Sequence, residues 1–298
     1  MIDSIISPLR ETSTPLEGVT TWRNRSNGFF CVDLTYFADP RKRSPEWVAL
    51  QRRGMPKAEW EREYGSKWLV YDGKPVYDDY DEDIHLYKGN LYVPSRVKLV
   101  SGWDAGPNDV NLAWALALVF SGTSAIIIDE FYIDDGDTKG FVDIVHGRLA
   151  MEWFRISAGH SIHVADQSVF TKSGVADGKA VADIMRQRGM YPIPGEIAFS
   201  KRRRIVTELL TQTSKSKEGK MVPRLRIHER CAKAREAFGG GYAYPKAAGG
   251  VGGAYKPLPL KNEFSHIANA IEYICSRMAL AAIEIPYEGR RLPASGVI

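Results

Sequence analysis

The chain has few cysteines and no long apolar run. Its 298 residues contain three cysteines, Cys31, Cys231 and Cys275, which are too few and too scattered for a disulfide framework or a zinc cluster. We therefore expect a reducing compartment. No apolar stretch approaches the roughly 20 residues of a membrane-spanning helix, and the first residues do not have the pattern of a secretory signal. We expect no membrane partner.

The overall composition is that of a globular protein. Hydrophobic residues make up 44% and charged residues 26% of the chain, which excludes disordered, collagen-like and coiled-coil classes. The length suggests about two domains and is sufficient to bury a core.

The positive charge is concentrated in one stretch. Residues 196–235 contain twelve Lys or Arg and four Glu, a net charge of +8, whereas the whole chain carries +4. The remaining residues therefore sum to −4. Such a patch is typical of a protein that binds a polyanion, and the alternative is a solvated helix face.

The character of the sequence changes near residue 95. Residues 1–95 are rich in Trp, Tyr, Arg and Pro, and the acidic stretch 76–85 is expected to form a solvated loop. Residues 45–69 suit two short helices, each with Pro in its first turn. We expect a second domain over residues 96–285 and a flexible tail over 286–298.

The second domain has a regular pattern of apolar segments. Three predicted strands with short links indicate an antiparallel meander, and a later strand reached through a helix is expected to run parallel. The predicted fold is α/β, a mixed sheet of three antiparallel strands followed by parallel strands, flanked by helices. The strands are expected over 96–104, 111–122, 124–133 and 161–166, and the main helices over 138–155, 179–189, 200–215 and 262–282.

Two carboxylates each follow a predicted buried strand. Asp104 ends the segment VKLVSGWD, and Asp166 ends SIHVAD. A charged side chain in such a place needs a partner, a metal or water, and two carboxylates brought together repel unless a cation lies between them. Oxygen ligands suit Mg²⁺ or Mn²⁺, and two such ions would assist hydrolysis of a phosphodiester. The alternative is that Asp104 begins a turn and Asp166 caps the next loop.

The segments around these carboxylates resemble a known family. LVSGWDAGPND, AIIIDEFY, HVADQS and SHIANAIEY are similar, in this order, to segments of the nuclease domain of phage large terminase subunits, which has a ribonuclease H-like fold. SPLRETSTP resembles the end of the terminase motor domain, and YFADPRKRSPEW, WEREYGSKW and GKPVYDDYDEDIH resemble the segment that joins motor to nuclease. The resemblance implies that residues 1–95 are a motor remnant and linker.

The chain departs from the family pattern in two ways. The phosphate-binding pattern GxxxxGK[ST] is absent, so no ATPase motif is present, and either the gene is split or the chain is a fragment. Where the family has Asp in a His-x-x-Asp-Ala pattern, this chain has Asn269 in the run from His266 to Ala270. An amide offers a metal an oxygen ligand but no charge. Glu130, Glu272 and His266 are candidates to support the site.

The resemblance implies an endonuclease that cuts double-stranded viral DNA during genome packaging. Asp104, Asp166 and Asn269 would hold a two-metal site with Mg²⁺ or Mn²⁺. The implied partners are double-stranded DNA, a separate ATPase motor polypeptide, the small terminase subunit and the portal protein. The implied location is the host cytoplasm, at the procapsid.

Four consecutive cations, Lys201, Arg202, Arg203 and Arg204, open a predicted helix. They oppose the helix dipole unless an anion is near, so we expect them to contact the DNA backbone. A run that only faces water is the alternative.

Two other functions stay open. With Asn269 in place of Asp, the domain would be a weakly active or inactive component that grips DNA. A junction resolvase or transposase with the same core is the third possibility, to be revealed by a preference for branched DNA.

Overall fold

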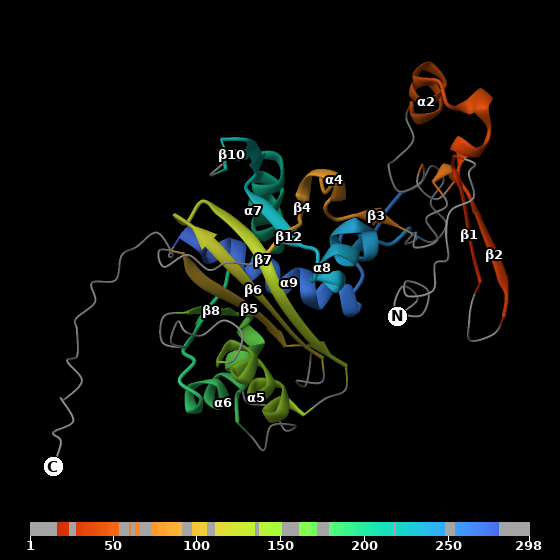
Figure 1. Cartoon of the computed structure of the whole chain (residues 1–298). Helices are drawn as coiled ribbons and strands as arrows, with labels where there is room; N and C mark the ends of the chain where they lie inside the picture. Colours follow the sequence, from red (N-terminus) through yellow and green to blue (C-terminus); the bar gives the residue numbers. More distant parts are fainter. Residues whose placement is uncertain are drawn as a thin grey trace, which may run out of the picture. The chain divides into compact units, whose positions relative to one another are not determined.

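The computed structural model describes two compact units, Met1–Asp72 and Gly73–Ile298, which are shown in Figure 1. The described residues are 17–23, 28–53, 60, 63–65, 73–90, 97–105, 111–134, 137–150, 161–171, 179–216, 219–247 and 254–279. The boundary predicted near residue 95 therefore moves to residues 72 and 73, because the segment after Gly73 packs into the second unit. The predicted tail over 286–298 and the motor-like SPLRETSTP lie outside the described residues.

The first unit contains a hairpin and one described α-helix. Its elements are β1 (Val19–Arg23), β2 (Phe30–Leu34), the 3-10 helices η2 (Tyr36–Ala38) and η3 (Pro40–Lys42), and α2 (Pro45–Arg52). Pro45 occupies the first turn of α2 as predicted, and the Ser44 hydroxyl caps the helix by accepting from the Trp47 amide at 3.1 Å. Trp47, Trp60 and Tyr64 pack together, with the Trp60 and Tyr64 rings stacked at 4.5 Å.

The second unit is built on a seven-stranded sheet in the order β4-β12-β7-β6-β5-β8-β9. Strands β5, β6 and β7 are antiparallel, and the outer strands on both sides run parallel to their neighbours. The predicted mixed sheet is therefore confirmed. The strands are β4 (Leu86–Tyr87), β5 (Lys98–Ala105), β6 (Leu112–Phe120), β7 (Ser124–Ile133), β8 (Ile162–Ala165), β9 (Pro192–Pro194) and β12 (Leu225–His228).

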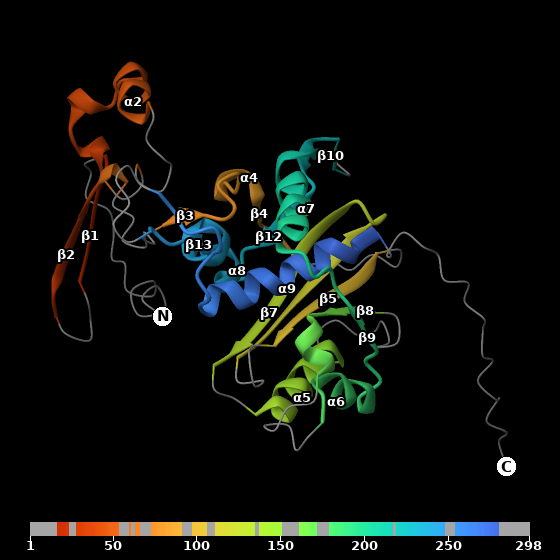
Figure 2. The same cartoon turned by 180° about the vertical axis from the view of Figure 1, so that it is seen from behind.

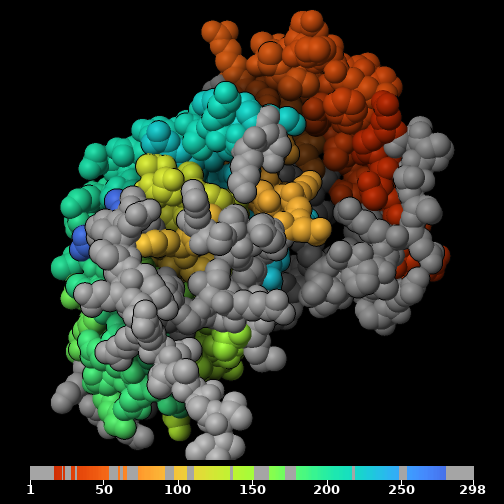
Figure 3. All heavy atoms as spheres, turned by 60° about the vertical axis from the view of Figure 1, so that its left-hand side comes forward, coloured from red at the N-terminus to blue at the C-terminus, as the bar shows by residue number. Residues whose placement is uncertain are grey.

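Helices cover both faces of this sheet. Figures 1 and 2 show α9 along one face, with α7 and α8 beside it, and α5 and α6 together on the other. In the space-filling view, green atoms of the α6 region lie at the lower end of this unit and teal atoms of the α7 region at the upper end (Figure 3). The helices are α4 (Glu82–His85), α5 (Thr138–Arg148), η7 (Gln167–Phe170), α6 (Val181–Gln187), α7 (Phe199–Thr211), α8 (Ala232–Glu236), the π-helix η8 (Ala237–Gly241) and α9 (Glu263–Arg277). Two small pairs, β3 (Lys74–Pro75) with β13 (Ala243–Tyr244) and β10 (Thr213–Lys215) with β11 (Met221–Pro223), complete it.

The two faces of the sheet differ in side-chain size. On β6 the large residues Trp114, Leu116 and Leu118 join the core that contains α5 and α6. The alternate positions are alanines, and Gly102 on β5 pairs with one of them, Ala115. A Cβ on Gly102 would collide with the Ala270 carbonyl oxygen, so the small residues let α9 lie directly on β5.

The acidic stretch 76–85 is not the solvated loop that the sequence predicts. Val76 and Tyr77 are 1% and 2% exposed, and the Tyr77 ring stacks on Phe238 with centroids 4.7 Å apart. Asp78 and Asp79 remain exposed. The prediction is wrong because the acids face water while the apolar residues beside them fill the space next to α9.

Within the part of the chain that the structure describes, no helix combines the length and apolarity needed to cross a membrane.

Candidate active site

Asp104 and Asp166 lie at the same end of two paired strands. Strands β5 and β8 run parallel with Trp103 opposite Ala165, so the two aspartates occupy the next positions along each strand. The Asp166 amide donates to the Trp103 carbonyl at 2.9 Å, which continues the pairing. Both side chains line one cavity of about 920 Å³. The structure thus brings the two predicted carboxylates together.

Helix α9 supplies the other side of this cavity. His266 and Asn269 are three residues apart and both line it, because residues at this spacing share a helix face. His266 Nδ1 lies 2.7 Å from Asp104 Oδ2, and its ring stacks on Tyr132. Asn269 is 2% exposed, and its amide oxygen accepts from the Tyr242 hydroxyl at 3.5 Å. The close approach of α9 at Gly102 brings these side chains to the strand ends.

Both carboxylate oxygens of Asp166 are held. Ser168 donates to Oδ1 from its backbone amide and from its hydroxyl, each at 2.7 Å, and Tyr273 donates from its hydroxyl to Oδ2. Burial by itself would raise the pKa of Asp166, but these hydrogen bonds outweigh it and lower the pKa below that of an ordinary aspartate. Asp166 is therefore ionised and fixed in orientation at neutral pH.

Arg202 is a cavity residue rather than part of an exposed cationic run. Its Nε donates to Glu272 at 2.8 Å, and the residue is 7% exposed. Because successive helical residues are about 100° apart, four consecutive cations cannot share one face. Arg202 falls on the buried face of α7 with Val206, whereas its three cationic neighbours are exposed. These neighbours are Lys201, Arg203 and Arg204.

The two glutamates predicted to support the site have other partners. Glu130 accepts from the amides of Lys233 and Ala234 at 2.7 and 2.8 Å, and so caps α8. Burial raises the pKa of Glu130 to about 7 despite these two bonds. Glu272 is fully buried between Arg202 and Tyr77, and burial raises its pKa. Neither side chain lines the cavity.

The donor set fits a hard divalent cation. Asp104, Asp166 and Asn269 line one cavity together with two further acids, Asp134 and Glu263, and oxygen ligands of this kind suit Mg²⁺ or Mn²⁺. Among the residues that the structure describes, no group of three or more His, Cys, Asp or Glu side chains could hold a metal ion. Of these four acids, Asp104 and Asp166 lie at the strand ends, whereas Asp134 and Glu263 are exposed, and Asn269 offers a neutral oxygen.

Sequence reasoning missed several side chains of the cavity, among them Tyr273, Ser168 and Lys261. Helical spacing contains a signal for Tyr273, because it lies seven residues after His266 and four after Asn269 and so shares their face of α9. Ser168 follows Asp166 by two residues, the spacing of an Asx turn. For Lys261 the sequence contains no comparable signal.

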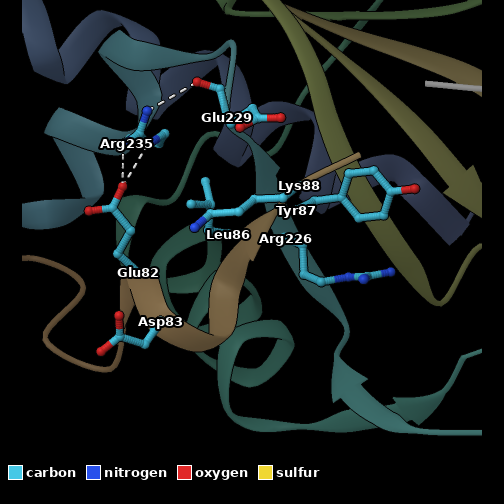
Figure 4. A pocket seen from close by; sticks show the side chains of 8 residues that line it. All are labelled: Glu82, Asp83, Leu86, Tyr87, Lys88, Arg226, Glu229 and Arg235. Atoms are coloured by element: carbon cyan, nitrogen blue, oxygen red, sulfur yellow. Dashed lines mark hydrogen bonds and ion pairs between the residues drawn. The ribbon is translucent and has the colours of Figure 1, made fainter. Parts of the chain in front are cut away.

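A second cavity, of about 680 Å³, lies beside β4 (Figure 4). Three acidic and three basic residues line it. Arg235 forms an ion pair with Glu82 and donates to the Glu229 carbonyl at 3.0 Å, while the Arg226 guanidinium lies over the Tyr87 ring. Because acidic and basic residues are balanced, the lining favours neither an anionic nor a cationic ligand.

No protein-family model matches the chain, and no curated protein does. Solved structures do resemble it. The large terminase from a thermophilic bacteriophage is 16% identical, with 81% of this chain and 54% of that chain covered and a TM-score of 0.48. This chain therefore spans about half the length of that terminase.

Two shorter structures are also similar. The large terminase nuclease domain from bacteriophage SPP1, with bound Mn, is 14% identical over 64% of this chain and 94% of that one, with a TM-score of 0.44. RuvC from T. thermophilus, in complex with a Holliday junction substrate, is 14% identical over 61% and 94%, with a TM-score of 0.30. The similar structures thus include the family that the sequence motifs resemble. At these identities the likeness concerns the fold alone.

Proposed function

We propose that the chain is a divalent-metal-dependent nuclease that hydrolyses phosphodiester bonds in double-stranded DNA. The observation that carries this proposal is the placement of Asp104 and Asp166 on paired strand ends, facing one cavity with Asn269. Two ionised carboxylates in one cavity repel each other, and a cation between them removes the repulsion.

Asp104 and Asp166 would hold a first Mg²⁺ or Mn²⁺, with Asn269 as a neutral oxygen ligand. The metal supplies Lewis-acid stabilisation of the reacting phosphate and activation of water. If a second ion binds, Asp104 and Asn269 are the residues of this chain that would hold it.

The protein's own groups orient the ligands and move protons. Ser168 and Tyr273 keep Asp166 ionised and in place. In the tautomer that donates from Nδ1 to Asp104, His266 has Nε2 as an acceptor, so it can take a proton. The exposed cations Lys201, Arg203 and Arg204 at the start of α7 would contact the DNA backbone.

A plasmid-nicking assay with Mn²⁺ tests this function. We expect Asp104→Asn to lower the nicking rate at least about a hundredfold, because a neutral amide replaces the carboxylate that binds the cation. Asp183→Asn on α6, whose carboxylate pairs with Arg186 outside the cavity, is the matched control and should nick like the unmodified chain. Equal nicking by the two variants would refute the proposal.

A weakly active component that grips DNA is the second candidate. It is favoured by Asn269, which gives the cavity one carboxylate fewer than the family pattern has. In this case the unmodified chain should retain duplex DNA without nicking it in Mn²⁺. A preference for branched over linear DNA in the same assay would instead indicate a junction resolvase.

The packaging context belongs to the same proposal. The terminase-like motifs imply action on viral DNA in the host cytoplasm, with a separate ATPase motor polypeptide, a small terminase subunit and a portal protein. Purification of the tagged chain from infected cells, with and without nuclease treatment, would test for these partners.

A further inference from the structure

A buried chain of contacts leads from the first residues of the second unit to the centre of α9. The Tyr77 hydroxyl donates to Glu272 Oε1 at 2.7 Å, and Arg202 Nε donates to Glu272 Oε2 at 2.8 Å. Glu272 is fully buried, so both oxygens are satisfied from these two sides.

The guanidinium of Arg202 is held on several sides. Besides its bond to Glu272, it donates from Nη1 to the carbonyls of Glu196 and Ile197 at 3.0 and 2.7 Å. Its central carbon lies 4.8 Å from the centroid of the Tyr273 ring. A planar, fixed guanidinium in this place limits where the ring of Tyr273 can lie.

Tyr273 completes the chain of contacts at the cavity. Its hydroxyl donates to Asp166 Oδ2, the carboxylate oxygen that Ser168 does not contact. The position of this hydroxyl therefore determines the orientation of an oxygen that a cation would use.

The burial of the ion pair between Arg202 and Glu272 also supports a positioning role. A buried ion pair adds little net stability compared with apolar side chains of the same volume. An apolar pair would fill the space between α7 and α9, but it would not fix a planar cation against Tyr273.

We infer that Tyr273 is a positioning residue for Asp166, and that Tyr77, Glu272 and Arg202 set its place. This inference rests on the proposed function, in which Asp166 is a metal ligand. It also assigns a role to the segment after Gly73, since the Tyr77 hydroxyl holds Glu272, and the Tyr77 ring lies beside Tyr242, which donates to Asn269.

The test measures Mn²⁺ affinity without DNA, by electron paramagnetic resonance titration, and nicking kinetics in parallel. We expect Tyr273→Phe to weaken Mn²⁺ binding about tenfold and to lower kcat with little change in KM for DNA, because only the orientation of a ligand is lost. Tyr77→Phe should act in the same direction by a smaller factor. Tyr191→Phe, which removes an exposed hydroxyl, is the matched control and should change neither quantity.

Unchanged or tighter Mn²⁺ binding by Tyr273→Phe would overturn the inference, since tighter binding means that the hydroxyl competes with the cation. The double variant Arg202→Met with Glu272→Gln removes both charges together and leaves no unpaired buried charge. We expect it to weaken Mn²⁺ binding as Tyr273→Phe does, and wild-type affinity would refute the role of the pair.

The affinity measurement separates this inference from the proposed function. If Asp104→Asn nicks normally, the nuclease proposal fails whatever the tyrosine variants do. If Asp104→Asn abolishes nicking but Tyr273→Phe binds Mn²⁺ normally, only the positioning role fails.

Discussion

Single residues set the charge of the cavity. Asp104 and Asp166 contribute negative charge at the strand ends, and Asn269 occupies a place on α9 where a carboxylate would add another beside them. The nearby positive charge of Arg202 is balanced by Glu272, which lies outside the cavity. The affinity of the site for a divalent cation therefore depends on how many of its oxygen ligands are charged.

Asn269→Asp should raise Mn²⁺ affinity on the order of tenfold and increase the nicking rate, because it adds a charged ligand. Without metal, the same variant should melt at a lower temperature, since the added carboxylate then repels those of Asp104 and Asp166. Calorimetry with and without Mn²⁺ measures both effects. Asn90→Asp, an exposed position with the same charge change, is the control, and an Asn269→Asp variant that behaves like it would count against Asn269 as a ligand.

His163 should make stability depend on pH. It is buried and bonded to Ser101, and burial lowers its pKa to about 4, compared with about 6.5 in an unfolded chain. Between these values the unfolded state binds more protons, so the free energy of unfolding should fall by up to about 3 kcal/mol as pH drops from about 6.5 to about 4.

Urea unfolding at pH 7, 5.5 and 4.5 measures this dependence. In His163→Gln the free energy of unfolding should fall less steeply with pH than in the unmodified chain. His146→Gln, at a partly exposed position on α5, should keep the slope of the unmodified chain. The same pH slope in all three proteins would disprove the assignment.

At the scale of elements, the site depends on how closely α9 lies on the sheet. The alanines of β6 and Gly102 of β5 remove side-chain bulk from one face, and α9 occupies that space. His266, Asn269 and Tyr273 share the face of α9 that reaches the strand ends. Packing and chemistry are therefore coupled through the distance between α9 and β5.

Gly102→Ala should lower the free energy of unfolding by about 2 kcal/mol or more and weaken Mn²⁺ binding, because its Cβ would collide with the Ala270 carbonyl. Gly147→Ala on α5 has open space around its Cβ and should stabilise by about 0.5 kcal/mol. Chemical unfolding of both variants gives the comparison. A Gly102→Ala protein as stable as the Gly147→Ala protein would show that α9 can shift without penalty.

At the scale of the whole molecule, the chain divides after Asp72 rather than near residue 95. Strand β4 joins the main sheet through β12, and Tyr77 and Tyr80 are buried in the second unit. The linker-like segment is therefore part of the folded unit that carries the cavity.

A chain that begins at Gly73 should fold cooperatively, and one that begins at residue 96 should be less stable by at least about 3 kcal/mol. The second chain lacks two buried tyrosines and the hydroxyl that satisfies Glu272. Circular dichroism during urea titration measures the difference. Equal stability of the two chains would mean that the segment contributes nothing to the fold.

Charge reversal tests the expected DNA surface. Lys201→Glu with Arg203→Glu should weaken binding of duplex DNA at least about tenfold at low salt and reduce the slope of log K against log salt by about two. Lys139→Glu with Arg186→Glu places the same change on exposed residues of α5 and α6, on the other face of the sheet, and should have a smaller effect. If both double variants weaken DNA binding equally, binding depends on the net charge of the protein and not on this surface.

Much of the second unit could be predicted from local pattern. Apolar segments and turn residues were sufficient for the antiparallel strands, the parallel strand after its crossover helix and the placement of Asp104 and Asp166 at strand ends. These features depend on the few residues next to them in the chain, which is why the sequence determined them.

Other features depended on contacts between distant segments. Glu130 caps α8 through an amide 103 residues away in the chain. Glu272 pairs with Arg202 across 70 residues and accepts from Tyr77 across 195 residues. A carboxylate or guanidinium has the same local pattern whether it faces water, a helix end or a cavity. Only the tertiary structure decides, because the free energy of burying a charge depends on the partner that satisfies it.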